Sequence, residues 1–125
     1  MNILIVDDNP TNLKRMRAQL EIEDHMVTQA QDGVEALERL DRQPVDAVIS
    51  DILMPLMDGL TLTRMLKANE RTRRIPIVAL TAFAMKGDEQ KAFDAGCDGY
   101  ITKPIDTRRF PAQVAGLLAN KKTKS

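Results

Sequence analysis

The chain has 125 residues, 43% of them hydrophobic and 29% charged, and its 18 basic and 18 acidic side chains give a formal net charge of zero. This length supports one domain with its own core, and the neutral balance argues against a protein built mainly to coat nucleic acid or a membrane. A single cysteine, Cys97, excludes an internal disulfide framework, and a single histidine, His25, excludes the usual Cys/His zinc site. The amino end, MNILIVDDNP, has too few consecutive apolar residues for a signal peptide or a membrane span, so we expect a cytoplasmic protein.

The first predicted elements are a strand and a helix. Residues 3–6 form a continuous apolar run, typical of a parallel strand buried on both faces, and the run ends at Asp7 and Asp8. Asn9 and Pro10 then fit the cap and the first position of a helix. Apolar residues follow at helical spacing: Leu13, Met16 and Leu20.

The second pair of elements is less strongly marked. Residues 26–30 predict a strand at an edge of the sheet. Asp32 with Glu35 three residues later resembles a capping box, which predicts a helix start. One face of this helix is marked by Val34, Leu37 and Leu40, and Pro44 ends it.

The third strand carries the residue on which the functional interpretation depends. Residues 47–49 read as a strand buried on both faces, and Asp51 closes the run. Because an ionised carboxylate is costly inside a core, we expect Asp51 at the carboxyl end of the strand, facing a crevice. Asp58 and Gly59 then open a helix with apolar residues Leu62, Met65 and Leu66.

Two further strands are predicted in the second half of the chain. Residues 75–80 form an apolar run that ends at Thr81. The helix after it stops at Gly96, a residue favoured just beyond a helix end. A short strand at residues 100–101 ends at Lys103.

A last helix completes the alternation. Its apolar residues are Phe110, Val114, Leu117 and Leu118, and Pro111 predicts a late start or a tight first turn. Five strands alternating with five helices predict an α/β fold, a doubly wound five-stranded parallel sheet with helices on both faces. Ligands bind such folds at the carboxyl ends of the strands, where the strand order reverses.

Polar residues follow four of the five predicted strands: Asp7 and Asp8, Asp51, Thr81 and Lys103. Two carboxylates about 4 Å apart repel by roughly 4 kcal/mol at an effective dielectric near 20, so three clustered carboxylates need a cation beyond Lys103. An oxygen-ligand site with open positions suits Mg²⁺ completed by a phosphate. A metal, a lysine, a hydroxyl and a reactive carboxylate together predict phosphoryl transfer onto an aspartate.

Four motifs, in this order and spacing, carry a family resemblance: IVDDN, SDILMPLMDG, LTA and YITKP. The chain resembles the receiver domains of two-component response regulators from residue 2 to about residue 120, which leaves residues 121–125 as a polar basic tail. TAFAMKGDE and GCDGYITKPI are especially similar to the single-domain DivK-like regulators. The resemblance implies a flavodoxin-like (βα)5 fold with strand order 2-1-3-4-5. It also implies a signalling protein that catalyses nothing beyond assisting its own phosphorylation and dephosphorylation.

The resemblance also assigns roles to the acidic residues. Asp51 matches the phosphoacceptor, which attacks a phosphohistidine on a sensor histidine kinase or a histidine phosphotransfer protein. Asp8 and Asp51 match direct Mg²⁺ ligands, Asp7 acts largely through water, and the backbone carbonyl of Leu53 completes the protein's share. Mg²⁺ is thus the implied cofactor.

Other matched residues bind the phosphoryl group or respond to it. Lys103 matches the lysine that pairs with the phosphoryl oxygens, and its bond to Pro104 is expected to be cis. Thr81 matches the hydroxyl that moves onto the phosphoryl group, and Tyr100 the aromatic residue that turns inward behind it. The downstream protein is expected to bind the face from Lys86 to Leu118.

Two bulky residues predict a long-lived phosphoryl group. In receivers the positions two beyond the phosphoacceptor and two beyond the switch hydroxyl flank the attacking water, and here they are Leu53 and Phe83. Neither side chain can orient water, so we expect slow self-dephosphorylation. Decay of the phosphoprotein, measured with Mg²⁺ and no partner, checks this, and a half-life of seconds would refute it.

Three alternatives remain open at this point. A Mg²⁺-dependent phosphohydrolase of the haloacid-dehalogenase type also forms an aspartyl-phosphate, but it carries a D-x-D pair and a cap domain, whereas this chain has adjacent Asp7 and Asp8 and no residues for a cap. A nucleotide- or flavin-binding module needs a glycine-rich phosphate loop, yet the loops after the first and third strands read NPTN and ILMPLMD. The chain could also be a receiver domain excised from a hybrid kinase.

Overall fold

The computed structural model describes residues 1–52, 57–81, 88–103 and 105–123. These residues alternate between strand and helix throughout, as predicted. In chain order the elements are β1 (Asn2–Val6), α1 (Pro10–Ile22), β2 (Met26–Ala30), α2 (Gly33–Arg42), β3 (Ala47–Asp51), α3 (Gly59–Ala68), β4 (Ile77–Thr81), α4 (Asp88–Ala95), β5 (Gly99–Thr102) and α5 (Phe110–Thr123). Among the described residues, no helix has both the length and the apolar character needed to cross a bilayer.

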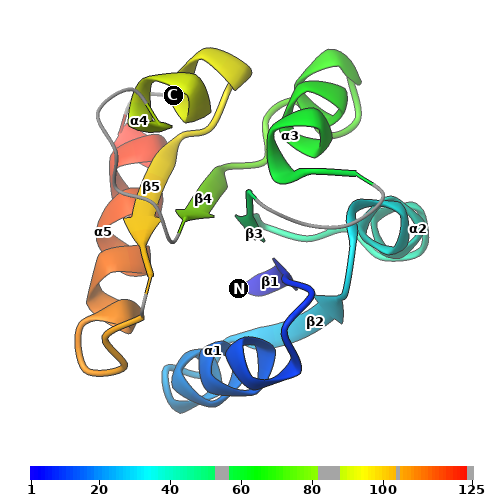
Figure 1. The fold of residues 1–125 in the computed structure, drawn as a ribbon. Coiled ribbons are helices and arrows are strands. Elements are labelled where there is room, and N and C mark those ends of the chain that lie inside the picture. Colours follow the sequence, from blue (N-terminus) through cyan, green and yellow to red (C-terminus); the bar gives the residue numbers. More distant parts are fainter. Residues whose placement is uncertain (53–56, 82–87, 104, 124–125) are drawn as a thin grey trace.

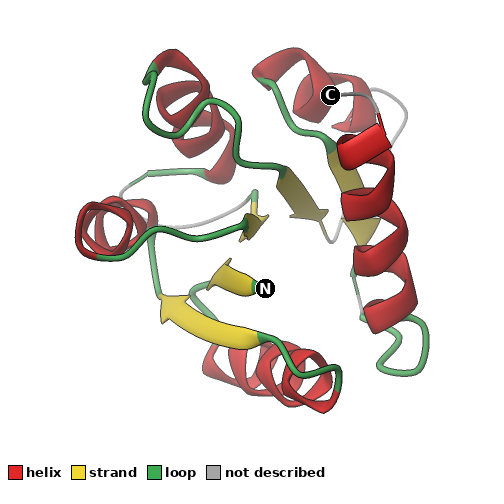
Figure 2. Cartoon of the chain, turned by 180° about the vertical axis from the view of Figure 1, so that it is seen from behind, coloured by secondary structure: helices red, strands yellow, loops and turns green. Residues whose placement is uncertain are grey.

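The five strands form one parallel sheet in the order β2-β1-β3-β4-β5, which confirms the predicted fold and strand order. Figure 1 shows the sheet at the centre, with α1 and α5 on one face and α2, α3 and α4 on the other. The view from behind in Figure 2 shows the same three layers. The order reverses between β1 and β3, and the carboxyl ends of both strands therefore border the crevice where such folds bind ligands.

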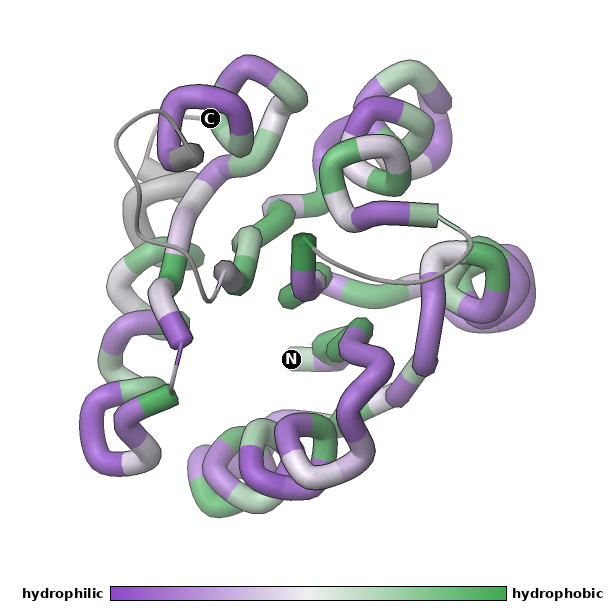
Figure 3. The backbone as a smooth tube through the Cα atoms, viewed as in Figure 1, coloured by the Kyte–Doolittle hydropathy of each residue, from purple (hydrophilic) through white to green (hydrophobic). Residues whose placement is uncertain are grey.

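Each face of the sheet has its own hydrophobic core, because the central strands are apolar on both sides. One core packs α1 and α5 against β1, β3, β4 and β5, with Met16, Ile49, Phe110 and Val114 among its most buried side chains. The other packs α2, α3 and α4 against the opposite face, around Leu4, Val48, Leu62 and Ala92. In the hydropathy colouring of Figure 3 the central strands β1, β3 and β4 are mostly hydrophobic, whereas hydrophobic and hydrophilic residues alternate along the surrounding helices.

Three helices begin at the side chains that the sequence predicts as caps. Each cap accepts a hydrogen bond from a backbone N–H in the first turn, which satisfies one of the amides left open there. The bonds run from Thr11 to Asn9 at 2.9 Å, from Glu35 to Asp32 at 2.8 Å and from Thr61 to Asp58 at 2.7 Å. Local sequence therefore fixes where these helices start.

The end of α4 confirms the role predicted for Gly96. Its φ is +110°, a conformation that favours glycine. Gly96 N–H donates to the carbonyl of Phe93 at 3.0 Å, and Cys97 N–H donates to that of Ala92 at 3.0 Å. This pair of bonds is the Schellman motif, which closes the helix and turns the chain into β5.

Some details of the prediction are wrong. Strand β4 begins at Ile77, two residues later than predicted, because the amide of Ile75 donates to the carbonyl of Thr72 at 3.0 Å and Pro76 has no N–H. Val34 is 44% exposed and does not share the buried face of α2, where Gly33 and Ala36 lie. Met65 on α3 is likewise 44% exposed.

The start of α5 accommodates Pro111. The helix begins at Phe110, so Pro111 takes its second position, where a missing N–H costs little. The carbonyl of Asp106 accepts bonds from the amides of Arg109 at 3.0 Å and Phe110 at 2.8 Å. The chain therefore turns tightly just before the helix, in line with the predicted tight start.

Replacing Gly116 by alanine is expected to stabilise the protein. Gly116 lies inside α5, is exposed, and has no atom within 4 Å of where a Cβ would be placed. Alanine loses less backbone entropy in a helix, so the free energy of unfolding should rise by about 0.5–1 kcal/mol. Urea unfolding of Gly116→Ala measures the difference, and a loss of stability would contradict the exposed placement.

A lysine that the sequence did not single out ties three segments together. The ammonium of Lys67 on α3 donates to the carbonyls of Arg73 at 3.1 Å and Ile75 at 3.0 Å, and lies 3.0 Å from Asp98 Oδ2. The same carboxylate oxygen accepts the amide of Ile77 at 2.9 Å. The cluster joins α3, the entry to β4 and the turn before β5.

Lys67→Met is expected to lower the free energy of unfolding by about 2–3 kcal/mol. The ion pair is mostly buried, with 20% of the Lys67 side chain and 19% of the Asp98 side chain exposed, so removing one partner leaves a largely desolvated charge behind. Urea denaturation measures the loss. Lys91→Met, at an exposed position of α4, serves as the control and should change stability by less than about 0.5 kcal/mol.

Candidate functional site

The predicted site residues converge at the carboxyl edge of the sheet. Asp51 is the last residue of β3 and Thr81 the last of β4, while Asp7 and Asp8 follow β1 and Lys103 follows β5. These four strands are adjacent. The parallel ladder therefore brings residues that are far apart in sequence into one crevice.

Lys103 is the centre of the charge arrangement. Its Nζ lies 2.9 Å from Oδ2 of Asp51 and 3.0 Å from Oδ2 of Asp7. Its backbone N–H donates to the carbonyl of Thr81 at 2.6 Å. The side chains are buried to different degrees: 15% of Lys103, 7% of Asp51 and none of Asp7 is exposed. One ammonium thus bridges two nearly buried carboxylates from different strands.

The pKa of Lys103 reflects this setting. Burial disfavours the charged ammonium, but the hydrogen bonds that it donates to Asp51 and Asp7 and the charges of the two carboxylates outweigh burial and raise the pKa of Lys103 above its ordinary value. The ammonium is therefore fully charged at neutral pH. A permanent positive charge beside Asp51 favours the ionised, nucleophilic form of that carboxylate and can also pair with the oxygens of an incoming anion.

The carboxylate of Asp7 has two hydrogen-bond partners besides Lys103. Its Oδ1 accepts the backbone N–H of Asn9 at 2.9 Å, and its Oδ2 lies 3.3 Å from Nδ2 of Asn12. Asn12 was not among the predicted site residues, although a polar residue in the first turn of the helix that follows the aspartates is a usable signal. Asp8 is exposed. The two adjacent aspartates therefore differ, one fixed and desolvated and the other open to solvent.

The three carboxylates form a cluster that fits a small divalent cation. Asp7, Asp8 and Asp51 each offer an oxygen, and these atoms all lie within 4.8 Å of one another. A donor set made only of oxygen, open on the side of the exposed Asp8, suits Mg²⁺, which keeps waters and is completed by substrate phosphate. Lys103 leaves the cluster with a net negative charge, which is the electrostatic reason for a cation there.

Comparison with known proteins identifies the family. The model of the response regulator receiver domain matches residues 3–115 of this chain. The chain belongs to this family. Its relatives include the polar-differentiation response regulator DivK of Brucella ovis, 38% identical over 119 residues, which cover 95% of this chain and 97% of DivK. The receiver is therefore similar to DivK over nearly its whole length, as the sequence motifs indicated.

Solved structures agree with the family. The receiver domain of a signal transduction histidine kinase from Syntrophus aciditrophicus is 35% identical with a TM-score of 0.86, and the match covers 95% of this receiver and 90% of that chain. The receiver domain of a sensor histidine kinase from Pseudomonas aeruginosa, whose active-site cleft coordinates a magnesium ion, is 36% identical with a TM-score of 0.84, covering 94% and 97%. The family assignment does not favour the phosphohydrolase or the nucleotide-binding alternative. Receiver domains of histidine kinases and DivK both resemble this chain.

The two predicted switch residues occupy different environments in the receiver. Thr81 is buried, with 4% exposed, at the end of β4. Tyr100 on β5 is half-buried and packs against the core that faces α2, α3 and α4. Because Tyr100 pairs in register with Ala79, it lies two residues back along the ladder from Thr81. The predicted roles of Leu53, Phe83 and the Lys103–Pro104 peptide bond lie outside the described residues, as does part of the predicted face at residues 86–118.

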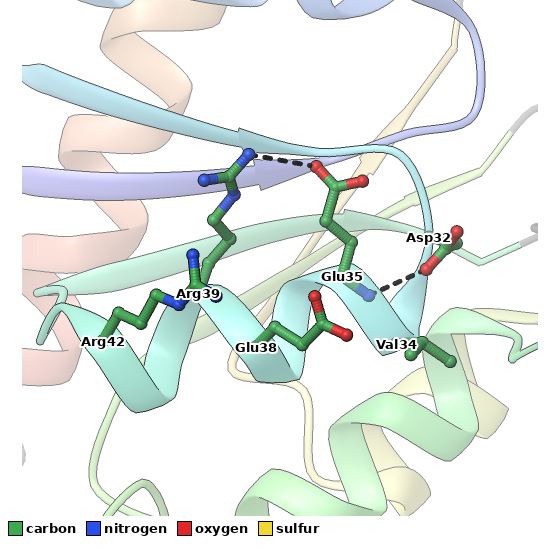
Figure 4. A pocket seen from close by; sticks show the side chains of 6 residues that line it. All are labelled: Asp32, Val34, Glu35, Glu38, Arg39 and Arg42. Carbon is green, nitrogen blue, oxygen red and sulfur yellow. Dashed lines mark hydrogen bonds and ion pairs between the residues drawn. The ribbon is translucent and has the colours of Figure 1, made fainter.

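A surface depression elsewhere on the receiver has the features of ordinary helix surface. The depression, about 400 Å³, lies on α2 and is lined by Asp32, Val34, Glu35, Glu38, Arg39 and Arg42. In Figure 4 Asp32 accepts the backbone N–H of Glu35 at 2.8 Å, and the side chain of Glu35 lies 3.5 Å from that of Arg39. Acidic residues near the helix start and basic residues in its last turn complement the helix dipole. We assign it no ligand.

Proposed function

We propose that this receiver domain works in the cytoplasm and takes a phosphoryl group onto Asp51 from a phosphohistidine of a sensor histidine kinase or histidine phosphotransfer protein. The observation that carries the proposal is the position of Lys103, whose ammonium lies within hydrogen-bond distance of both Asp51 and Asp7. Asp7, Asp8, Asp51 and the backbone carbonyl of Leu53 are the proposed Mg²⁺ ligands. When bound, Mg²⁺ neutralises charge on the phosphoryl oxygens.

The reaction is a substitution at phosphorus. A carboxylate oxygen of Asp51 forms a new O–P bond, the P–N bond to the donor imidazole breaks, and the imidazole nitrogen takes up a proton. Lys103 pairs with the phosphoryl oxygens as their charge moves toward Asp51. Asn12 and the amide of Asn9 hold the Asp7 carboxylate in place. This chain therefore supplies a nucleophile and preorganised charges, and its catalysis is limited to its own phosphorylation and dephosphorylation.

Phosphorylation is proposed to change the partner-binding surface through Thr81 and Tyr100. Thr81 ends the strand next to the one that ends in Asp51, so a short movement of its hydroxyl can reach a phosphoryl group there. Moving Thr81 opens space behind it, into which the half-buried Tyr100 ring can turn. The surface read by the downstream protein is the face formed by residues 86–118.

Intact mass after incubation with acetyl phosphate and Mg²⁺ tests the proposal. We expect the mass to rise by one phosphoryl group and peptide mapping to place it on Asp51. Asp51→Asn should stay unmodified, because an amide is not a nucleophile here, and Asp41→Asn on the exposed surface of α2 should behave like the wild type. Absence of any adduct, an adduct at another residue, or continuous release of phosphate at enzymatic rates would contradict it.

A further inference from the structure

The backbone carbonyl of Asp51, the residue proposed to accept the phosphoryl group, is enclosed by two neighbours. On one side the hydroxyl of Ser50, which is 2% exposed, donates to the Asp51 carbonyl oxygen at 3.0 Å. On the other side the same oxygen lies against the α-carbon of Gly59, the first residue of α3. Both contacts are to the backbone of the nucleophilic residue and not to its carboxylate.

Gly59 is fixed in this position by hydrogen bonds at both of its backbone groups. Its N–H donates at 2.8 Å to the carbonyl of Ile52, the residue directly after Asp51. Its carbonyl accepts the buried hydroxyl of Thr63 at 2.8 Å. The start of α3 is therefore bound to the end of β3, and the distance between them is determined locally.

A side chain at residue 59 does not fit this arrangement. A Cβ there would overlap the carbonyl oxygen of Asp51, and would lie 2.9 Å from the carbonyl carbon of Asp51 and 3.0 Å from Cα of Ile52. All three atoms are backbone, so no rotation of a side chain can relieve the contact. Either α3 or the end of β3, with Asp51 on it, must move.

We propose that Gly59 and Ser50 are positioning residues for phosphoryl transfer: they fix the Asp51 backbone, and through it the distance of the carboxylate from Lys103 and from the metal ligands. The inference rests on the proposed function of Asp51. The Asp51 carboxylate reaches Lys103 at 2.9 Å and belongs to the acidic cluster, so a shift of its backbone changes both contacts together. A misplacement of about 1 Å costs such a reaction roughly 100-fold.

Two other glycines give a graded comparison. A Cβ at Gly33 would meet only the side chain of Met57, at 2.8 Å from Sδ and 2.9 Å from Cβ. Sδ can rotate away, but Cβ moves only with the backbone of Met57. A Cβ at Gly116 on α5 meets nothing within 4 Å. All three lie in helices, so replacement by alanine removes the same backbone freedom at each. They differ in what the new methyl group touches.

The test measures the rate constant of phosphorylation by acetyl phosphate at saturating Mg²⁺, with intact mass as the readout. Gly59→Ala should be about 100-fold slower than the wild type, and Gly33→Ala should be slowed less, because its new methyl group meets no backbone atom of Asp51. Asp41→Asn on the exposed surface of α2 should be unchanged. A wild-type rate constant for Gly59→Ala would overturn the proposal.

A second readout separates positioning from loss of fold. Partial unfolding also lowers the observed rate constant, because only folded molecules are phosphorylated. Circular dichroism therefore measures the folded fraction of each variant, and the observed rate constant is divided by that fraction. If Gly59→Ala does not fold, Ser50→Ala decides: we expect it to be about fivefold slower through loss of one hydrogen bond, and an unchanged rate constant would reject the proposal. A wild-type protein that forms no adduct would reject the proposed function instead.

Discussion

Lys103→Met is expected to slow phosphorylation by acetyl phosphate about 100-fold or more. The ammonium lies 2.9 Å from Asp51, where the phosphoryl oxygens must approach, and removing one preorganised donor from such a site typically costs 100- to 1,000-fold. Methionine keeps the length and the apolar stem of lysine but not its charge. The rate constant at saturating Mg²⁺ measures the effect.

The same substitution is expected to destabilise the protein when Mg²⁺ is absent. Without Lys103 the buried carboxylates of Asp7 and Asp51 lose their shared cation, and breaking a buried ion pair from one side costs about 3–5 kcal/mol. The pKa of Lys103 is raised in the folded state. The stabilisation of the fold by Lys103 is therefore present in full below the pKa of this lysine in the unfolded chain, and it is lost as the pH rises through its pKa in the folded protein. At neutral pH the whole effect should be visible.

Urea unfolding in EDTA measures this loss, and Lys14→Met is the matched control. Lys14 is an exposed lysine on α1, and its replacement should leave both the rate constant and the stability near the wild-type values. If Lys103→Met unfolded at the wild-type urea midpoint, the ammonium would not be compensating the two carboxylates, and the electrostatic argument for the site would fail.

The sequence predicted this site because its signals are local. An apolar run that ends in a polar residue marks the carboxyl end of a buried strand, and the parallel order then places Asp7, Asp51, Thr81 and Lys103 together. Helix caps such as Asn9 are equally local, since the cap and the amide it binds are two residues apart. The convergence of these strand ends and the position of this helix cap were both confirmed.

What the sequence did not predict depends on contacts between distant segments. Asp98 follows an ordinary helix end, and nothing near it indicates that its carboxylate bonds the ammonium of Lys67, 31 residues away. The motif around Asp51 includes Gly59, but only the packing of α3 on β3 shows that a side chain at residue 59 would overlap the backbone of Asp51. Val34 has the right spacing for the core, yet Gly33 and Ala36 take the buried positions of α2, and Met57 packs against Gly33.

Asp8→Asn is expected to weaken Mg²⁺ binding at least about 30-fold while leaving the metal-free protein as stable as the wild type, or slightly more stable. Asp8 is exposed and belongs to the acidic cluster, so the amide relieves repulsion without leaving a buried group unpaired. A divalent ion about 4 Å from a unit charge gains about 2 kcal/mol even at the dielectric of water, which corresponds to the expected factor. Calorimetric Mg²⁺ titration measures it, with Asp41→Asn as the control.

Asp8→Asn and Lys103→Met should change the stabilisation of the protein by Mg²⁺ in opposite directions. Mg²⁺ at 100 times its dissociation constant stabilises a binding protein by about 2.7 kcal/mol, and Asp8→Asn should lose most of that gain at the same concentration. Lys103→Met keeps all three carboxylates and loses a competing cation, so Mg²⁺ should stabilise it more than it stabilises the wild type. Both follow from one premise, that the metal ion and Lys103 compensate the same negative charges. A Lys103→Met protein with no greater response to Mg²⁺ than the wild type would show that the premise is wrong.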